Sequence, residues 1–112
     1  MSTYDLSAIE DSSRDNFKIW LDDVRPVPEG YVLAKSVNEA IALIEAIEAL
    51  NKNIVLLDLD HDLGDYAPDG GDAIHLLDYL VENEKFYPVV FHTANPVGRA
   101  NMERMITRFW PK

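Results

Sequence analysis

Cysteine is absent from the 112 residues, and this excludes disulfides, thiolate nucleophiles and every zinc site built on cysteine ligands. Basic side chains are also scarce, because 10 Lys and Arg stand against 20 Asp and Glu and leave a formal net charge of −10. A surface of this charge repels nucleic acid and anionic membranes. We therefore expect no broad nucleic-acid surface and no membrane association.

No apolar run approaches the length of a membrane span, and the N-terminus has no basic-plus-apolar signal pattern, so we expect a cytoplasmic protein. Hydrophobic residues make up 47% of the chain, an ordinary share for a globular protein. The length suits one domain. Residues 1–16 are polar with scattered apolar side chains, and we interpret them as an N-terminal arm or one short helix outside the core of an α/β domain over residues 17–112.

Apolar periodicity predicts strands that alternate with helices. Branched and aromatic residues predict strands at 17–21, 31–34, 54–57 and 88–94. Helical spacing predicts helices at 36–50, at 72–83 and from residue 96 onward, the first opened by a capping box and the last by an Asn-Pro start. The order β, β, α, β, α, β, α implies an open, mostly parallel sheet of about four strands with helices on its faces. The run 54–57 is expected to be buried on both faces.

Acidic side chains gather where the strand at 54–57 is expected to end. Asp occurs at positions 58, 60, 62, 65, 69 and 72 with no Lys or Arg among them, so their repulsion must be relieved. Ligands of open α/β sheets bind at the carboxyl ends of the strands, where this segment is placed. We interpret it as a functional site. The alternative is a solvated acidic loop.

Two other strand ends carry polar side chains that a parallel sheet would bring to the same edge. Asp22 and Asp23 follow the first strand, and His92 follows the last. Carboxylates in this number suit Mg²⁺ or Mn²⁺. His92 and His61 are candidates to share acid and base roles, because imidazole titrates near pH 7.

The start of the last helix is a candidate phosphate site. Its free amides and dipole favour an anion, and Arg99 follows Asn95 by about one turn. A helix cap is the alternative role for Asn95. The expected partner is a phosphate-containing small molecule or nucleotide.

Several of these residues resemble receiver domains of two-component response regulators. The resemblance rests on Asp22 and Asp23 after the first strand, an Asp closing the strand at 54–57, Asp69 before a Gly, and Thr93 after the fourth strand. Receivers have a flavodoxin-like sheet, bind Mg²⁺ and phosphorylate an aspartate. This sequence lacks the helix between the first two strands, the fifth strand and the lysine that precedes that strand.

The chain is more closely similar to short receiver-like domains called cyclic-phosphate-processing receiver domains. Three blocks carry this similarity, at 20–26, 59–64 and 92–99. The resemblance implies a truncated flavodoxin-like α/β fold with a modified receiver site that acts on cyclic phosphates. The resemblance carries over to eight positions: Asp22, Asp23, Asp60, His61, Asp62, His92, Asn95 and Arg99. From the gathering of these residue types at strand ends, we expect metal binding by Asp22, Asp23, Asp60 and Asp62, catalysis by His61, His92 and Asp60, and phosphate binding by Thr93, Asn95 and Arg99.

Two functions remain open from the sequence. The first is a metal-dependent phosphoesterase that hydrolyses or binds a cyclic phosphate on a nucleotide or an RNA end. The second is a non-enzymatic, degenerate receiver module that binds a partner or nucleotide. Ile54–Asp60 also resembles the nucleophile motif of haloacid-dehalogenase-like phosphatases, but that fold needs a longer chain and a lysine beyond the threonine.

Overall fold

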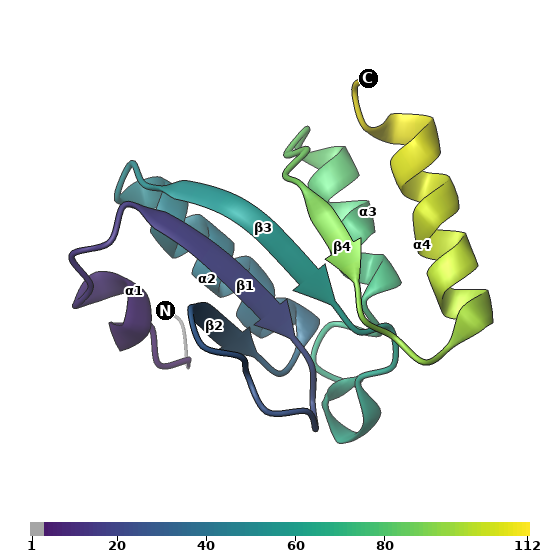
Figure 1. Cartoon of the computed structure of the whole chain (residues 1–112), viewed down its shortest axis with the longest axis horizontal. Coiled ribbons are helices and arrows are strands. Elements are labelled where there is room, and N and C mark those ends of the chain that lie inside the picture. The colour runs from purple at the N-terminus through teal and green to yellow at the C-terminus, as the bar shows by residue number, and fades with distance from the viewer. Residues whose placement is uncertain (1–3) are drawn as a thin grey trace.

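Strands and helices alternate along the chain. A computed structural model describes residues 4–112. The elements, in order, are α1 (Ser7–Glu10), β1 (Asn16–Leu21), β2 (Tyr31–Ala34), α2 (Val37–Ala49), β3 (Asn53–Leu59), the 3₁₀ helix η1 (Gly64–Tyr66), α3 (Ile74–Glu82), β4 (Val89–Phe91) and α4 (Pro96–Phe109). The four strands are all parallel and lie in the order β2-β1-β3-β4 (Figure 1). The α/β class and the predicted, mostly parallel sheet of four strands are confirmed.

Local chemistry starts the two longest helices at the predicted residues. The Ser36 hydroxyl accepts a hydrogen bond from the Glu39 amide at 3.0 Å, and the Glu39 carboxylate accepts one from the Lys35 amide at 2.8 Å. At α4 the Asn95 side-chain oxygen accepts from the Gly98 amide at 3.0 Å, and a proline follows the cap. Each such cap stabilises its helix by about 1 kcal/mol.

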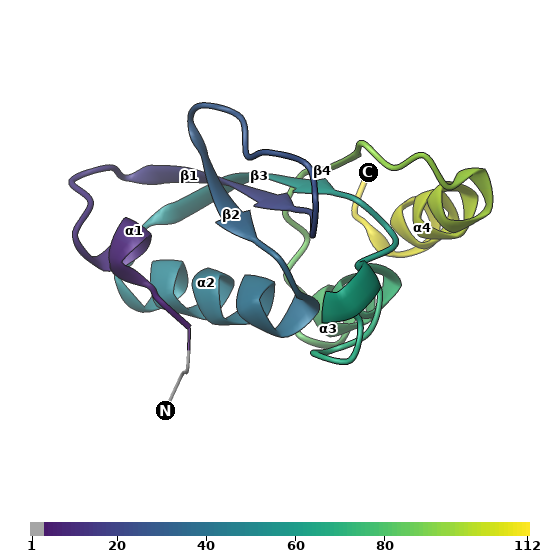
Figure 2. The ribbon, with the colours of Figure 1, turned by 90° about the horizontal axis from the view of Figure 1, so that it is seen from below.

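Helices α2 and α3 cover one face of the sheet, and α4 flanks β4 (Figure 2). No helix in the described part of the chain lies over the other face, which we call the open face. Val55 and Val90 are 43% and 44% exposed. The prediction that the strand at 54–57 is buried on both faces was therefore wrong. Its physical reason is the β1–β2 connection, where Pro26 and Pro28 prevent the helix that could have covered this face.

The N-terminal segment contributes to the core. Ile9 in α1 is fully buried, and Leu6 packs against the same cluster. The expected short helix is present as α1, but the prediction that this segment lies outside the core was wrong at Ile9 and Leu6, because both apolar side chains pack into the core cluster. Residues 1–3 of that arm lie outside the described residues.

The apolar faces of the helices are not buried along their whole length. Phe109 in α4 is 40% exposed, and Leu50, which caps α2, is 44% exposed. Leu43 in α2 and Leu76 in α3 are buried. His75 is exposed on α3. None of the helices in residues 4–112 combines the length and hydropathy needed to cross a lipid bilayer.

Candidate functional site

Asp22, which follows β1 directly, is only 1% exposed. Its Oδ1 accepts hydrogen bonds from the amides of Val24 and Arg25 at 2.8 and 2.9 Å. Its Oδ2 lies 3.0 Å from Arg25 Nη1 and 2.8 Å from His92 Nε2. Burial opposes ionisation, but the amides of Arg25 and Val24 and then the two side chains outweigh it and lower the pKa of Asp22. Asp22 is thus a fixed, buried anion.

Asp22, Asp23 and Asp60 form what we call the inner acidic group. Each offers a carboxylate oxygen, and these oxygens lie within 4.8 Å of one another. Asp23 Oδ1 is buried and has no hydrogen-bond partner among residues 4–112. A buried carboxylate oxygen without a partner is unfavourable, and a divalent cation with oxygen ligands is the kind of group that would satisfy it.

A glycine makes room for the inner acidic group. A Cβ atom at Gly64 would lie 2.4 Å from Asp23 Oδ2, and Gly64 has a φ of +51°. Glycine adopts this positive φ without strain, and it has no Cβ to collide with the carboxylate. The loop after β3 therefore presses its backbone against the carboxylate of Asp23.

Arg25 supplies the positive charge beside these carboxylates. Its Nη1 lies 3.0 Å from Asp22 Oδ2 and 3.3 Å from Asp60 Oδ2. Within the described residues no lysine forms an ion pair with the group. Arg25 lies in the first of the three sequence blocks, but the sequence assigned it no role.

His92 is held between two carboxylates on the open face. Its Nδ1 lies 2.7 Å from Asp58 Oδ1, and its Nε2 contacts Asp22. The imidazole stacks on Trp20 with ring centroids 3.7 Å apart and planes within 1°. Both ring nitrogens are thus engaged, and the ring cannot turn without leaving Trp20.

Asp58 lies inside β3 and not after its end, so the predicted strand end was too early. Because side chains alternate along a strand, buried Leu57 and Leu59 place Asp58 on the open face, beside its register partner Trp20. Burial and then the charge of Asp58 raise the pKa of Tyr31 on β2. The alternation of apolar and acidic residues was the signal that could have found Asp58.

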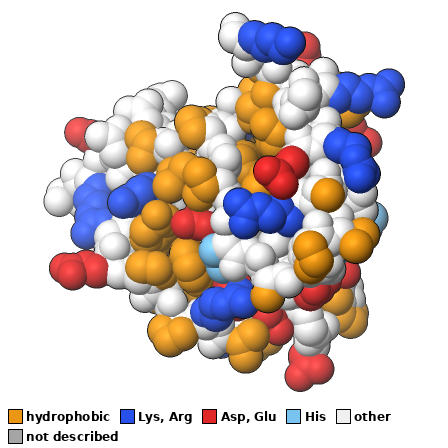
Figure 3. Space-filling model, turned by 45° about the vertical axis from the view of Figure 1, so that its right-hand side comes forward, with side chains coloured by type: hydrophobic (Ala, Val, Ile, Leu, Met, Phe, Trp, Pro, Cys, Tyr) orange, Lys and Arg blue, Asp and Glu red, His pale blue; other side chains and the backbone are white. Residues whose placement is uncertain are grey.

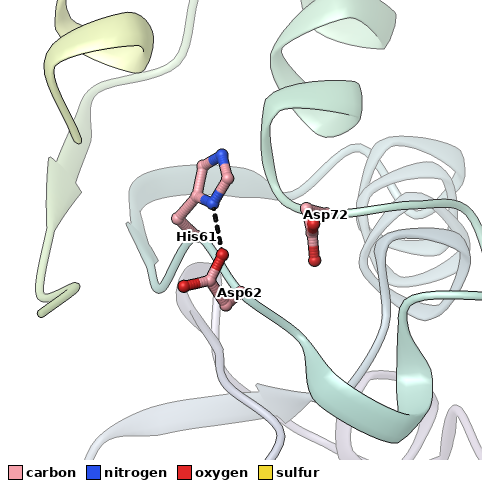
Figure 4. A group of neighbouring side chains, drawn as sticks. All are labelled: His61, Asp62 and Asp72. Atoms are coloured by element: carbon pink, nitrogen blue, oxygen red, sulfur yellow. Dashed lines mark hydrogen bonds and ion pairs between the residues drawn. The ribbon is translucent and has the colours of Figure 1, made fainter. Parts of the chain in front are cut away.

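His61, Asp62 and Asp72 form a second cluster, which we call the outer group. Figure 4 shows one ring nitrogen of His61 turned toward Asp62 and the other turned away. The first, Nδ1, lies 2.8 Å from Asp62 Oδ1 and lowers the pKa of Asp62. Asp62 also accepts from the Asn95 amide group at 3.2 Å, and Asp72 accepts from the Leu63 amide at 3.0 Å. The chain's own donors therefore satisfy much of this group.

Asp69 holds the acidic loop to the rest of the fold. It accepts hydrogen bonds from the Ser36 hydroxyl at 2.7 Å, from the Asn38 amide at 3.1 Å and from the Tyr4 hydroxyl. The Tyr4 hydroxyl is the largest cause of the lowered pKa of Asp69, and the Ser36 hydroxyl is the next. Asp69 is a structural residue of the loop.

A family model described as the cyclic-phosphate processing receiver domain matches residues 17–108, from β1 into α4. The chain belongs to this family. The resemblance inferred from the three sequence blocks is confirmed, and the parallel sheet is a receiver-like, flavodoxin-like α/β fold. The comparisons with curated proteins and with solved structures gave no match.

In the folded receiver domain, three of the four predicted metal ligands lie together and the fourth lies in another cluster. Asp22, Asp23 and Asp60 lie together in the inner acidic group, whereas Asp62 belongs to the outer group with His61. The two predicted catalytic histidines therefore have different surroundings.

The three predicted phosphate contacts lie around the start of α4. Thr93 Oγ1 accepts from the Asn95 amide at 3.1 Å, and Asn95 is the helix cap. Arg99 lies on α4 with its Nε 3.7 Å from Glu103 Oε1. Sequence reasoning assigned no role to Asp72, whose contact with Leu63 appears only once the loop is folded.

Proposed function

We propose that this receiver domain is a metal-dependent phosphoesterase that opens a cyclic phosphate on a nucleotide or an RNA end. One observation carries the proposal: the buried Asp23 Oδ1 has no partner in the described chain, although it lies beside two further buried carboxylates. Asp22, Asp23 and Asp60 would hold Mg²⁺ or Mn²⁺. The bound ion would place positive charge at the phosphate oxygens.

His61 is the proposed general base and acid. Asp62 holds its Nδ1, which leaves Nε2 to accept a proton, and Nε2 makes no hydrogen bond to residues 4–112. A water molecule gives its proton to Nε2, its oxygen bonds to phosphorus, and one ester P–O bond of the ring breaks. The same nitrogen then returns the proton to the leaving oxygen, which leaves a phosphate monoester.

His92 has a different role in this proposal. Both of its nitrogens lie against carboxylates, so it has no free nitrogen to exchange a proton with substrate. It holds Asp22 in position from the open face. The sequence-based prediction that His92 and His61 share proton transfer thus becomes a proposal that His92 positions and His61 transfers.

The start of α4 is the proposed phosphate contact. The helix dipole favours an anion there, and the Thr93 hydroxyl lies beside the cap. Arg99 is one turn further along. Arg25, 43% exposed at its side chain, adds the positive charge that an anionic substrate needs on a chain with a net charge of −10.

Hydrolysis of 2′,3′- and 3′,5′-cyclic nucleotides in Mg²⁺ or Mn²⁺ tests the proposal. We expect turnover of at least one of them by the wild type and by His75→Ala, whose side chain is exposed on α3. His61→Ala should lower kcat by about 10²- to 10⁴-fold. If no cyclic nucleotide is hydrolysed faster by the wild type than by His61→Ala, the proposal fails.

One contact favours a second function, a non-enzymatic module that binds a nucleotide or partner. The Arg25 guanidinium already lies between Asp22 and Asp60, so it could neutralise the pocket without a metal. Titration of Mn²⁺ into the wild type and into Arg25→Ala separates the two functions. Binding by the variant alone, without turnover by the wild type, would select the module.

A further inference from the structure

A groove with a volume of about 350 Å³ lies between β4 and α4. Val90, Phe91 and Ile106 supply its apolar walls, and Arg99 and Glu103 line it as a charged pair. Figure 3 shows this side of the molecule, where hydrophobic side chains surround adjacent basic, acidic and histidine side chains. Neither the inner acidic group nor the outer group lines this groove.

The groove lies next to residues of the candidate site, both along the chain and across the sheet. Val90 is the register partner of Asp58, which contacts His92. Phe91, which lines the groove, is followed directly in the chain by His92 of the candidate site. Arg99 belongs to both, because it lines the groove and lies one turn from the start of α4.

The lining chemistry selects one kind of occupant. A phosphate inside the groove would face the carboxylate of Glu103, and an alkyl chain would make no polar contact with Arg99 or Glu103, whose side chains are 48% and 56% exposed. A flat heteroaromatic ring satisfies both requirements, since it has apolar faces and an edge on which donors and acceptors lie side by side. The volume is within the range of small-ligand pockets, and a net charge of −10 disfavours a long polyanion.

We propose that the groove binds the nucleobase of the nucleotide whose cyclic phosphate lies at the start of α4. This inference rests on the proposed function and names the substrate class of the same site: a nucleoside cyclic phosphate and not a base-free cyclic phosphate ester. Val90 and Phe91 contact the ring, and Arg99 and Glu103 bond its edge.

Val90→Trp fills the groove and tests the proposal. Val55→Trp is its matched control, because Val55 is equally exposed, at 43% against 44%, and lies outside the groove. We expect Val90→Trp to raise KM for a nucleoside 2′,3′-cyclic phosphate about tenfold, the size of one lost base stack, with kcat retained. Turnover of the base-free ester ethylene phosphate should not change. An unchanged KM for the nucleotide in Val90→Trp would overturn the base subsite while the phosphoesterase stands.

A second measurement needs no turnover. Guanosine, adenosine, cytidine and uridine, which carry no phosphate, are titrated into ¹⁵N-labelled protein while the amide signals of Phe91 and Ile106 are followed. We expect saturable shifts in the wild type and in Val55→Trp, and none in Val90→Trp. Such shifts without hydrolysis of any cyclic nucleotide would leave the base subsite standing while the proposed reaction fails. Absence of saturable shifts with all four nucleosides would overturn the subsite.

Discussion

The inner acidic group and the outer group both contain aspartates and both draw on the loop after β3, yet their carboxylates differ in burial and in hydrogen-bond partners. The side chains of Asp22 and Asp60 are 0% and 10% exposed, whereas the Asp62 side chain is 61% exposed. Asp62 accepts hydrogen bonds from Asn95, and Asp72 accepts one from a backbone amide. Asp23 keeps a buried oxygen without a partner in the described chain. Burial without a donor, and not the number of carboxylates, is what marks a candidate cation site.

Each group also has a glycine pressed against it. A Cβ at Gly64 would meet Asp23 at 2.4 Å, and a Cβ at Gly98 would meet the His61 ring at 2.5 Å. A side chain at Gly64 would therefore displace Asp23, a proposed metal ligand, and a side chain at Gly98 would displace His61, the proposed base. This difference allows the two groups to be disturbed separately.

The largest expected effect separates the two histidines. His61→Ala should lower kcat by about 10²- to 10⁴-fold and leave the metal-induced rise in Tm intact. His92→Ala should leave two carboxylates without their shared partner, so we expect it to lower the free energy of unfolding as well as activity. Steady-state kinetics and thermal unfolding on the same samples check this. Equal losses of kcat with equal losses of stability would remove the distinction.

Metal should stabilise the fold through the inner acidic group alone. A cation that binds only the folded chain at about a hundred times its Kd stabilises by roughly 2.7 kcal/mol. For a domain of this size, that is a rise in Tm of order ten degrees. Asp60→Asn should abolish most of the rise, whereas Asp72→Asn should retain it because Asn can still accept from the Leu63 amide.

Calorimetry in EDTA and in millimolar Mg²⁺ or Mn²⁺ measures these shifts. An unmoved wild-type Tm in both ions would count against the metal assignment. A rise that disappears in Asp72→Asn and survives in Asp60→Asn would transfer the site to the outer group.

The two glycines provide a subtler comparison. Gly64→Ala places a side chain at a φ of +51°, with about 1 kcal/mol of strain, and displaces Asp23, so metal affinity should fall about 10- to 100-fold. Gly98→Ala, inside α4, favours the helix by up to about 1 kcal/mol but displaces His61, so it should reduce kcat and keep metal affinity. Mn²⁺ titration and kinetics on both variants check this opposite pattern.

The smallest effect concerns pH in the presence of EDTA. The folded-state pKa of Asp22 is below its ordinary 3.8, so its stabilisation is fully present above that pH and is lost as pH falls through the lower folded value. Asp22→Asn should therefore lose less stability than the wild type on acidification from pH 5 to pH 2. The pKa of Asp62 shifts in the same direction, but exposure limits its effect to below about 1 kcal/mol.

Urea midpoints across that range measure the slopes. We expect Asp62→Asn to follow the wild-type curve closely and Asp22→Asn to be visibly flatter. A flatter curve for Asp62→Asn than for Asp22→Asn would contradict the contrast between exposed and buried carboxylates.

The sequence alone determined the elements and the edge of the sheet at which they end. Caps at Ser36 and Asn95 act within a few residues, so their chemistry is readable from spacing. Alternation of strands and helices then implied a parallel sheet and placed the polar strand ends together. The three sequence blocks carried the family resemblance that the match over residues 17–108 confirmed.

Only the tertiary structure decided which polar residues share a cluster and which face of the sheet is left open. Whether Asp62 lies with Asp60 or with His61 depends on how the loop turns after β3, where Gly64 adopts a positive φ. The contact of Arg25 with Asp60 joins two segments far apart in the chain, as does that of His92 with Asp22. Such contacts depend on burial and distance across the sheet, and the spacing of residues along one chain contains neither.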